Sequence, residues 1–428
     1  MSSEQEQVVD PWAVKGATVN GINQAIDYNK LIEQFGTQKI TPDLLDQLEA
    51  KIGKLHHLIR RRVFFSHRDL QHILEKPFYL YTGRGPSSGM HVGHFVPFVI
   101  CQWLQKVFDI PIVIQLTDDE KFYFKDLTLE QTTRTAYDNI KDIIACGFDL
   151  SKTFIFINSE YMNPPFYKNI CKINRLITTS QSKNCFGFKD SDSIGKLSFV
   201  SVQAAPAFSS SFPHIFGNVN YHCLIPCAID QDPYFRLTRD VASRLKAPKP
   251  ILLLAKFFPA LQGPSSKMSS SDENSAIFLT DTPNQIKKKI NKYAFSGGKD
   301  TVEEHRLHGG NTDVDTSYQY LTFFLEDDAE LLEIKNKYKS GEMLSGEIKQ
   351  KCIEVLQRVV GEFQDKRAKV SDSVVQEFLS SQRIFEIDGF KKRVEEAAEL
   401  KKKDDALKKA QADLKKQAKI QAKKDAQK

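Results

Sequence analysis

Residues 78–94 read FYLYTGRGPSSGMHVGH, and this stretch carries the strongest indication of the fold. It opens with the apolar run Phe78 to Tyr81, continues through a segment rich in Gly, Ser and Pro, and leads into a periodic segment from Phe95 to Phe108. Such an order predicts a strand, a loop and a helix. A helix start presents unpaired N–H groups and the positive end of its dipole, so the loop favours a phosphate group.

The last four residues of this stretch add chemistry to the predicted helix start. His91 and His94 carry imidazoles that can donate hydrogen bonds to phosphate oxygens. Gly93 between them has no Cβ, so an adenine or a ribose can come close to the backbone. The pattern by itself is short, and a chance match is a real alternative.

A second patch strengthens the interpretation. Residues 264–271 read PSSKMSSS and follow the apolar run Ile251 to Leu254. Lys267 therefore lies in a hydroxyl-rich stretch after a predicted strand, where it can swing onto phosphates. A loop of this composition is usually just solvated, but the first patch makes that explanation unlikely here. Together the two patches predict an enzyme that activates a carboxylate with ATP.

The two patches resemble the signature motifs of the class I aminoacyl-tRNA synthetases, which hold ATP between them on a Rossmann-like sheet. Four longer stretches narrow the resemblance to the eukaryotic cytoplasmic tryptophanyl-tRNA synthetases. They are YLYTGRGPSS (79–88), QLTDDEK (115–121), CAIDQDPYF (227–235) and AFSGG (294–298). The resemblance covers residues 8–390.

The resemblance implies a tryptophan–tRNA ligase of α/β fold. We expect it to convert L-tryptophan and ATP to tryptophanyl-adenylate and pyrophosphate, and then to transfer tryptophan to the 3' terminal ribose of tRNA(Trp). It implies Mg²⁺ that accompanies ATP and is held by phosphates and water, without a protein-bound metal cage. It also implies a homodimer that works in the cytoplasm and has no membrane partner.

The resemblance assigns residues as well. Catalysis falls to His91, His94, Lys267 and Ser269. ATP binding falls to Arg84, Gly85, His91, Gly93, His94, Lys267, Met268 and Ser270. Tryptophan binding falls to Tyr81, Gln115, Glu120, Gln203 and Gln231, with Asp230 and Lys121 as supports. In this set Tyr81 and Gln115 bind the indole, while Glu120, Gln203 and Gln231 hold the α-ammonium group. Without the resemblance, each pocket residue has an ordinary explanation, such as the end of a strand or a solvated acid.

The bulk properties agree with a large soluble enzyme. The chain has 428 residues, of which 41% are hydrophobic and 27% charged, and this length suits two or three domains. No apolar stretch is long enough to span a bilayer, and the acidic start does not resemble a signal peptide. The seven cysteines are scattered without a C-x-x-C pair, which argues against a disulfide framework or a zinc site.

Composition and resemblance divide the chain into five parts. We expect an N-terminal extension at 1–75, in which Asp10-Pro11-Trp12 belongs to a flap over the ATP site. A Rossmann-like catalytic domain follows at 76–271, in which strands predicted at 78–81, 110–115, 154–158 and 251–254 alternate with helices. It carries a dimer-forming insertion at about 161–217. An all-helical anticodon-binding domain spans 272–370, and 371–390 returns to the catalytic domain. In the anticodon-binding domain one face of a helix that starts near Ser345 is predicted from the spacing of Ile348, Cys352, Val355, Leu356, Val359 and Phe363. The aromatic run at 318–324 is either core or a base-stacking surface. A Lys-rich tail covers 391–428. The basic run His56 to Arg62 is either a surface turn or a tRNA contact.

The positive charge of the chain is concentrated in its tail. Residues 391–428 hold 13 Lys and one Arg against seven Asp and Glu, so their net charge is +7, whereas the whole chain is +6. Leu400, Leu407 and Leu414 lie seven apart, which suits a helix with a thin apolar stripe. A polyanion such as tRNA could order this segment, and a purely solvated tail fits the same composition.

Three other functions fit part of the evidence. A tyrosyl-tRNA synthetase shares the fold and the motifs but binds a phenol. A small nucleotidyltransferase can carry the His-x-Gly-His pattern without the Lys-Met-Ser loop or the long helical region. A non-catalytic RNA-binding or signalling relative could keep the fold, but it would have no need of Lys267 and both histidines.

Overall fold

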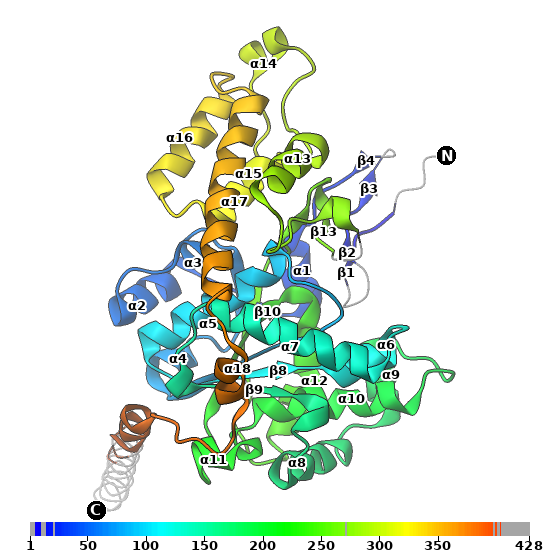
Figure 1. Cartoon of the computed structure of the whole chain (residues 1–428), viewed down its shortest axis with the longest axis vertical. Helices are drawn as coiled ribbons and strands as arrows, with labels where there is room; N and C mark the ends of the chain where they lie inside the picture. Colours follow the sequence, from blue (N-terminus) through cyan, green and yellow to red (C-terminus); the bar gives the residue numbers. More distant parts are fainter. Residues whose placement is uncertain are drawn as a thin grey trace, which may run out of the picture.

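The structure is a computed structural model of the chain, and it describes residues 5–9, 14–19, 22–269, 272–396, 399 and 403. A central sheet with helices around it forms the middle of the molecule, and a block of helices rises from it at the top of Figure 1. This is the predicted α/β class, with a mostly parallel sheet and a helical C-terminal region.

The central sheet has seven strands in the order β5-β6-β11-β10-β7-β8-β9. Their bounds are β5 (Gln38–Lys39), β6 (Phe64–Arg68), β7 (Phe78–Arg84), β8 (Ile112–Leu116), β9 (Thr153–Ile157), β10 (His222–Ala228) and β11 (Ile251–Ala255). Strands β11, β10, β7, β8 and β9 are parallel, whereas β6 and β5 add an antiparallel edge. All residues of β8, β9 and β11 are buried, as expected for a parallel sheet covered on both faces.

The strand order places a topological switch between β7 and β10. From β7 the chain moves outward through β8 to β9, and it then returns to the other side of β7 to add β10 and β11. The crossovers diverge at this point, so a crevice for ligands is expected outside the carboxyl ends of β7 and β10. The predicted phosphate loop directly follows β7.

The strands predicted at 78–81, 110–115, 154–158 and 251–254 are confirmed with shifted ends as β7, β8, β9 and β11. Strand β10 was not predicted. Pro226 lies in its middle and pairs with Leu253, although a proline argues against a central strand because it lacks an N–H. The helix expected from Phe95 is α5 (Val92–Phe108), which begins three residues earlier and makes His91 its N-cap.

Helices cover the sheet and form the insertion. They are α1 (Tyr28–Phe35), α2 (Pro42–Ile52), α3 (His57–Arg60), α4 (His72–Glu75), α6 (Asp118–Phe124), α7 (Leu129–Ala145), α8 (Pro164–Asn174), α9 (Thr179–Phe186), α10 (Ile194–Ala204), α11 (Pro213–Phe216) and α12 (Asp232–Ala242). Helix α5 packs on β7 and β10, and this fixes its start beside the switch point. None of the described helices has the length and apolarity that a membrane span requires.

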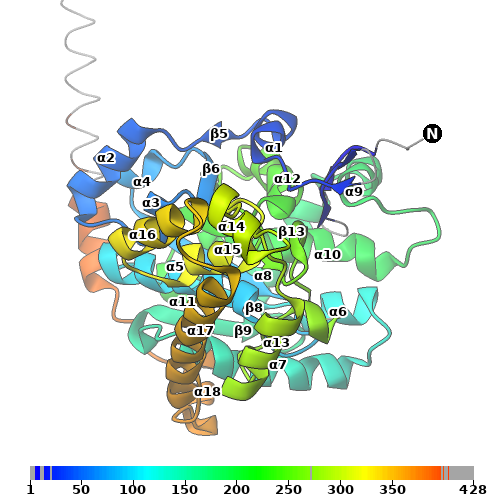
Figure 2. The ribbon, with the colours of Figure 1, turned by 90° about the horizontal axis from the view of Figure 1, so that it is seen from above.

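The C-terminal block consists of α13 (Pro283–Tyr293), α14 (Val302–His308), α15 (Thr316–Phe324), α16 (Asp328–Lys339) and α17 (Ser345–Arg367). Helix α17 descends from this block toward the sheet, as Figures 1 and 2 show from two directions. Its predicted apolar face is confirmed, because Ile348, Cys352, Val355, Leu356 and Phe363 are buried and Val359 is half-buried. The aromatic run at 318–324 is mainly core, with Tyr320 fully buried.

Arginines of the basic run at 56–62 form ion pairs and hydrogen bonds with other parts of the protein. Arg60 and Arg61 both pair with Asp328 at the start of α16, each at 2.6 Å. Arg61 also donates to the carbonyls of Thr322 and Leu325 at the end of α15. Positive charge is favourable at a helix C-terminus. The run therefore joins the N-terminal region to the α15–α16 corner.

Two further segments pack against the catalytic part. Helix α18 (Asp372–Leu379) lies against β9, and Phe385 packs edge-on against Phe154 of that strand. At the other end, β1 (Val8–Val9) and β2 (Val14–Lys15) join a small sheet with β13 (Gly263–Lys267) and β12 (Pro259–Ala260), and β3 (Thr18–Val19) pairs with β4 (Ile22–Asn23). Asp10-Pro11-Trp12, Ser270 and nearly all of the Lys-rich tail lie outside the described residues.

Candidate active site

Backbone hydrogen bonds bring the two sequence patches together. Val92 N donates to Ile277 O at 2.9 Å, and Leu279 N donates to Met90 O at 3.0 Å. The segment that follows the second patch therefore runs antiparallel to the start of α5. On the other side of this patch, Met268 N donates to Phe258 O at 2.9 Å. Phe258, which thus holds the residue after Lys267, also lies against Gly93, because a Cβ there would be 3.0 Å from its Cβ, at the end of α5 that carries the histidines.

His91 and His94 form a reciprocal cap at the start of α5. The Nδ1 atom of His91 accepts from His94 N at 3.3 Å, and the Nδ1 atom of His94 accepts from His91 N at 3.4 Å. The two rings are stacked with centroids 3.5 Å apart. A nitrogen that accepts from a backbone N–H carries no proton, so each neutral ring holds its proton on Nε2.

Burial keeps both imidazoles neutral. It lowers the pKa of His91 to about 3, and it lowers the pKa of His94 well below its usual value, with the positive charge of Arg84 adding to both shifts. The Nε2 atom of His91 is buried and has no hydrogen-bond partner within the described part of the chain. A buried N–H without a partner is costly, so this atom fits a ligand that supplies an acceptor.

Arg84 holds the predicted phosphate loop in place through hydrogen bonds to its backbone. Its guanidinium contacts the Asn139 side chain on α7 and donates to the carbonyls of Ser88 at 3.0 Å and Gly89 at 3.3 Å. Burial lowers the pKa of Arg84 to about 10, against the opposing influence of Asp142. Asp142 in turn pairs with Arg367 at the end of α17. The hydrogen bonds of Arg84 named above go to Asn139, Ser88 and Gly89 of the protein itself. The direct contact with ATP predicted for Arg84 therefore remains a prediction.

Gly85 and Gly93 each allow a close approach within the protein. A Cβ on Gly85 would lie 1.9 Å from Cε of Lys121 and 2.7 Å from Oε2 of Glu120. A Cβ on Gly93 would lie 3.0 Å from Cβ of Phe258 and 3.1 Å from the His91 ring. The atoms near Gly85 are the ends of flexible side chains, which can move, whereas the Cβ of Phe258 near Gly93 is less free to give way. The predicted contacts of both glycines with ATP stay predictions.

Lys267 is held by a buried acid. Its Nζ atom donates to Oδ2 of Asp230 at 2.9 Å, and the Lys267 side chain keeps 36% of its exposure while that of Asp230 keeps 5%. The other carboxylate oxygen, Oδ1, has no partner among the described residues. Asp230, which the sequence suggested as a support for the amino acid, pairs with the lysine here, and its role toward the amino acid stays a prediction. Met268 is buried, and Ser269 offers its carbonyl to Ser275.

The predicted indole readers Tyr81, in the middle of β7, and Gln115, near the carboxyl end of β8, meet each other. The Tyr81 hydroxyl lies 2.6 Å from Oε1 of Gln115 and 3.0 Å from the carbonyl oxygen of Gln203 on α10. Tyr81 and Gln115 are buried, and Oε1 of Gln203 is also buried without a partner in the described structure. Three of the five predicted tryptophan residues therefore converge. The surface that they form offers hydrogen-bond acceptors.

The other two residues predicted to bind tryptophan, Glu120 and Gln231, lie on different elements and make no described hydrogen bond to Tyr81 or Gln115. Glu120 on α6 accepts from Thr117 at 2.6 Å and from Lys121 at 2.8 Å, beside Gly85. Gln231 is half-buried and ends the short 3-10 turn η5 (Ile229–Gln231) before α12. Glu120 thus borders the phosphate loop, whereas no described contact joins Gln231 to the indole readers.

Sequence reasoning missed two polar residues behind Gln115. Asn158 and Asp119 are hydrogen-bonded to each other at 2.7 Å, and Asn158 also accepts from Gln115 at 2.8 Å. Asn158 directly follows the last residue of β9, so a search for polar residues at the carboxyl ends of all parallel strands would have found it. Asp119 was quoted only as part of a motif.

A shallow hollow at the α6–α7 turn belongs to no predicted site. It encloses about 450 Å³ and is lined by Phe122, Asp126, Leu127, Thr128, Leu129, Glu130 and Gln131.

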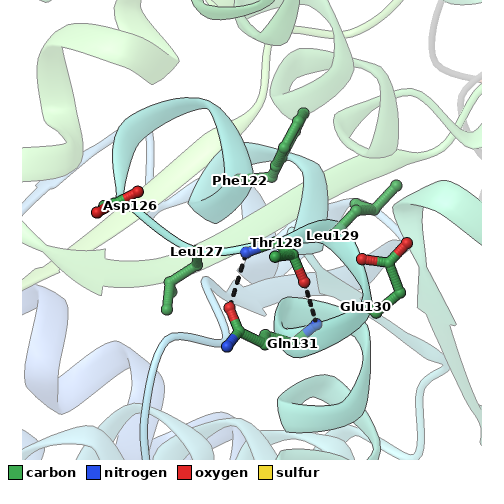
Figure 3. Close-up of a pocket in the computed structure, with 7 residues that line it drawn as sticks. All are labelled: Phe122, Asp126, Leu127, Thr128, Leu129, Glu130 and Gln131. Atoms are coloured by element: carbon green, nitrogen blue, oxygen red, sulfur yellow. Dashed lines mark hydrogen bonds between the residues drawn. The ribbon is translucent and has the colours of Figure 1, made fainter.

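 Figure 3 shows that Thr128 and Gln131 face each other there, as the capping box of α7, whose first residue is Leu129. Because helix capping explains the polar groups of the hollow, we assign it no ligand.

The neutral state of His91 makes stability depend on pH. Its pKa is about 3 in the folded chain and about 6.5 when unfolded, so the unfolded state binds more protons between these values. The stabilisation is complete above pH 6.5 and is lost as pH falls toward 3. In His91→Asn the side chain still caps α5 but cannot titrate. Between pH 6.5 and 4.5, urea unfolding should show the wild type losing about 1.4 kcal/mol per pH unit relative to this variant.

The control is His308→Asn, at an exposed position of α14. Its stability should follow that of the wild type across the same pH range. A constant difference between wild type and His91→Asn would contradict the buried neutral imidazole.

Comparison with known proteins places this geometry in a family. Residues 74–361 match the family model described as class I tRNA synthetases for W and Y. The cytoplasmic tryptophan–tRNA ligase of Schizosaccharomyces pombe is 59% identical over 393 residues, covering 90% of this chain and 100% of that protein. The human protein of the same name is 57% identical over 390 residues, covering 89% of this chain and 82% of that protein.

Solved structures agree with the sequence relatives. The tryptophanyl-tRNA synthetase of Giardia lamblia superimposes with a TM-score of 0.79 at 43% identity, over 84% of this chain and 97% of that one. The enzyme of Encephalitozoon cuniculi, solved with bound tryptophan, gives a TM-score of 0.78 at 44% identity, over 83% and 98%. The chain therefore belongs to the class I tRNA synthetases of the tryptophan and tyrosine family.

Proposed function

We propose that the chain is a tryptophan–tRNA ligase that activates L-tryptophan with ATP and then transfers it to the 3' terminal ribose of tRNA(Trp). The observation that carries this proposal is the acceptor surface of Tyr81 and Gln115 at the switch point, next to the two ATP motifs. An indole offers one N–H donor, which this surface fits. The names of the closely similar relatives support the same choice.

In the first step a carboxylate oxygen of tryptophan attacks the α-phosphorus of ATP. The bond from that phosphorus to the bridging oxygen breaks, and pyrophosphate leaves with the electron pair. The protein contributes positioning and stabilisation of charge. We assign the Nε2–H groups of His91 and His94 to the phosphate and ribose side, where neutral donors need no counter-ion.

Lys267 supplies the positive charge for the leaving pyrophosphate. In the structure it rests on Asp230, and its partial exposure leaves it free to move onto a phosphate. Ser269 and Ser270 anchor the loop around it in this proposal. In the second step a ribose hydroxyl of tRNA, the 2'-hydroxyl by class I resemblance, attacks the adenylate carbonyl and AMP leaves.

Mg²⁺ accompanies ATP in this proposal and would neutralise charge on its phosphates. Among the described residues no group of three or more His, Cys, Asp or Glu is placed to ligate a metal. Mg²⁺ usually keeps several waters and binds to substrate phosphates, which suits such a site. The donors from this chain, two imidazoles and a lysine, bind phosphate oxygens and are not magnesium ligands.

We further propose a homodimer formed through the insertion at about 161–217. Met162, Tyr167 and Ile194 of this region are large side chains that are exposed by 44%, 56% and 83%. A second copy of the chain would cover them. We also place the enzyme in the cytoplasm, because the relatives cited above are named as cytoplasmic proteins.

Tryptophan-dependent exchange of labelled pyrophosphate into ATP tests the proposed function, with tyrosine as the control substrate. We expect exchange with tryptophan and almost none with tyrosine. A site that pairs a buried acceptor with a substrate N–H discriminates strongly against ligands that leave it unsatisfied. Exchange with tyrosine alone would identify a tyrosyl enzyme, and exchange with neither would favour a non-catalytic relative.

Replacement of Lys267 tests its assigned role. Lys267→Ala should lower the rate of adenylate formation by roughly 10² to 10³, because one charged donor to the transition state is lost, while tryptophan affinity changes little. Stopped-flow kinetics of adenylate formation measures this rate. Lys249→Ala, which removes an exposed lysine ahead of β11, is the control and should keep the wild-type rate. An unchanged rate in Lys267→Ala would remove this lysine from the mechanism.

Deletion of residues 391–428 tests the Lys-rich tail. Because the tail carries a net charge of +7, its loss should weaken tRNA binding and flatten the dependence of affinity on salt. Pyrophosphate exchange, which needs no tRNA, should be unaffected. Filter binding of tRNA at several salt concentrations measures the effect. The same affinity for the full and truncated chains at every salt concentration would show that the tail does not bind tRNA.

A further inference from the structure

A chain of side-chain hydrogen bonds runs from the proposed indole site into the protein. The Tyr81 hydroxyl donates to Oε1 of Gln115 at 2.6 Å, and Nε2 of Gln115 donates to Oδ1 of Asn158 at 2.8 Å. Nδ2 of Asn158 then donates to Oδ1 of Asp119 at 2.7 Å. Tyr81 lies in β7, Gln115 near the end of β8, Asn158 directly after β9 and Asp119 on α6, so these hydrogen bonds run from the strand beside the switch point outward across one half of the sheet.

Asp119, at the inner end of these hydrogen bonds, decides which group of each amide donates and which accepts. Oδ1 of Asp119 also accepts from the backbone N–H of Glu120 at 2.9 Å, so this atom is an acceptor. Asn158 must therefore turn its NH₂ group toward Asp119 and its oxygen toward Gln115. Gln115 in turn gives its NH₂ group to Asn158, which leaves its oxygen on the side of Tyr81.

A backbone carbonyl supports the same direction from another element. Nε2 of Gln115 lies 3.3 Å from the carbonyl oxygen of Val202 on α10, and a carbonyl can only accept. The longer distance makes this bond weaker than the one to Asn158. Gln115 is 0% and Asn158 1% exposed, so water is not available to replace a lost partner.

We propose that Asn158 and Asp119 are positioning residues that keep the oxygen of the Gln115 amide turned toward tryptophan, and so make the enzyme select a ring that carries an N–H. The inference rests on the proposed function, because it deepens the role of the indole site. Turned by half a rotation, the Gln115 amide would present NH₂ to the indole N–H, and two donors would face each other. The selectivity then belongs to the whole chain of bonds and not to Gln115 alone.

Two substitutions break the chain at different links. Asn158→Ala removes the stronger acceptor of Gln115, and Asp119→Ala removes the acceptor that orients Asn158. Asp119→Asn is the conservative variant, because its oxygen can still accept from Asn158 and from the Glu120 N–H. Thr133→Val is the matched structural control. It removes a 2.9 Å hydrogen bond to Asp118, the neighbour of Asp119 on α6, and leaves the hydrogen bonds from Tyr81 to Asp119 intact.

The measurement compares tryptophan with β-(benzothiophen-3-yl)alanine, in which sulfur replaces the indole N–H. Pyrophosphate exchange gives kcat and KM for both amino acids and KM for ATP. We expect Asn158→Ala and Asp119→Ala to lower the preference for tryptophan, as a ratio of kcat/KM values, about tenfold. The change should come from a higher KM for tryptophan, with KM for ATP within about twofold of wild type. Asp119→Asn and Thr133→Val should keep the wild-type preference.

The outcomes separate this inference from the proposed function. If the wild type prefers tryptophan and both alanine variants keep that preference, the positioning role is wrong while the proposed function stands. An equal loss in Thr133→Val, or a parallel rise of KM for ATP, would show general loosening and would also overturn it. A wild type that shows no exchange with tryptophan overturns the proposed function and this inference together. Because the two alanine variants break separate links, either one that folds decides the question.

Discussion

The site depends on the antiparallel pairing of residues 90–92 with residues 277–279. These segments are far apart in the sequence, yet two backbone hydrogen bonds of 2.9 and 3.0 Å hold them side by side. The pairing places the loop of Lys267 next to the start of α5, whose own position is set by packing on β7 and β10. A ligand at the switch point can then meet donors from both patches. Without this contact the two patches would be separate features of the surface.

Burial determines which groups near this contact carry a charge, because it lowers the pKa values of His91, His94 and Arg84. The two imidazoles are neutral because burial and Arg84 lower their pKa values, and their mutual cap directs both protons to Nε2. The positive charge under the phosphate loop comes from Arg84, and the negative charge of Asp142 opposes it; Asp142 itself forms an ion pair with Arg367 of α17. A line of charged groups therefore connects the C-terminal helical block with the loop that follows β7. The other positive charge near the site, Lys267, forms an ion pair with Asp230.

Much of the fold could be predicted from the sequence, because strands and amphipathic helices produce local patterns of apolar residues. Short apolar runs gave four of the five parallel strands, and the spacing of Ile348, Cys352 and Phe363 gave the buried face of α17. The patterns failed where a strand breaks its own rules, as in β10 with Pro226. The two patches of the site stand out in the sequence because they occur together, each after a predicted strand, whereas either patch alone has an ordinary explanation. Asp230 as the partner of Lys267, and Asn158 and Asp119 behind Gln115, depend on contacts between distant segments, which no local pattern encodes.

The central claim is that one ATP lies between the histidines of α5 and Lys267, with tryptophan beside it. A crystal structure of the chain with tryptophan and a non-hydrolysable ATP analogue tests it most directly. The account predicts phosphate oxygens within hydrogen-bond distance of Nε2 of His91 or His94, Lys267 moved from Asp230 onto the phosphates, and the indole N–H on Oε1 of Gln115. Either ligand bound elsewhere, or the two patches too far apart to contact the same nucleotide, would contradict it.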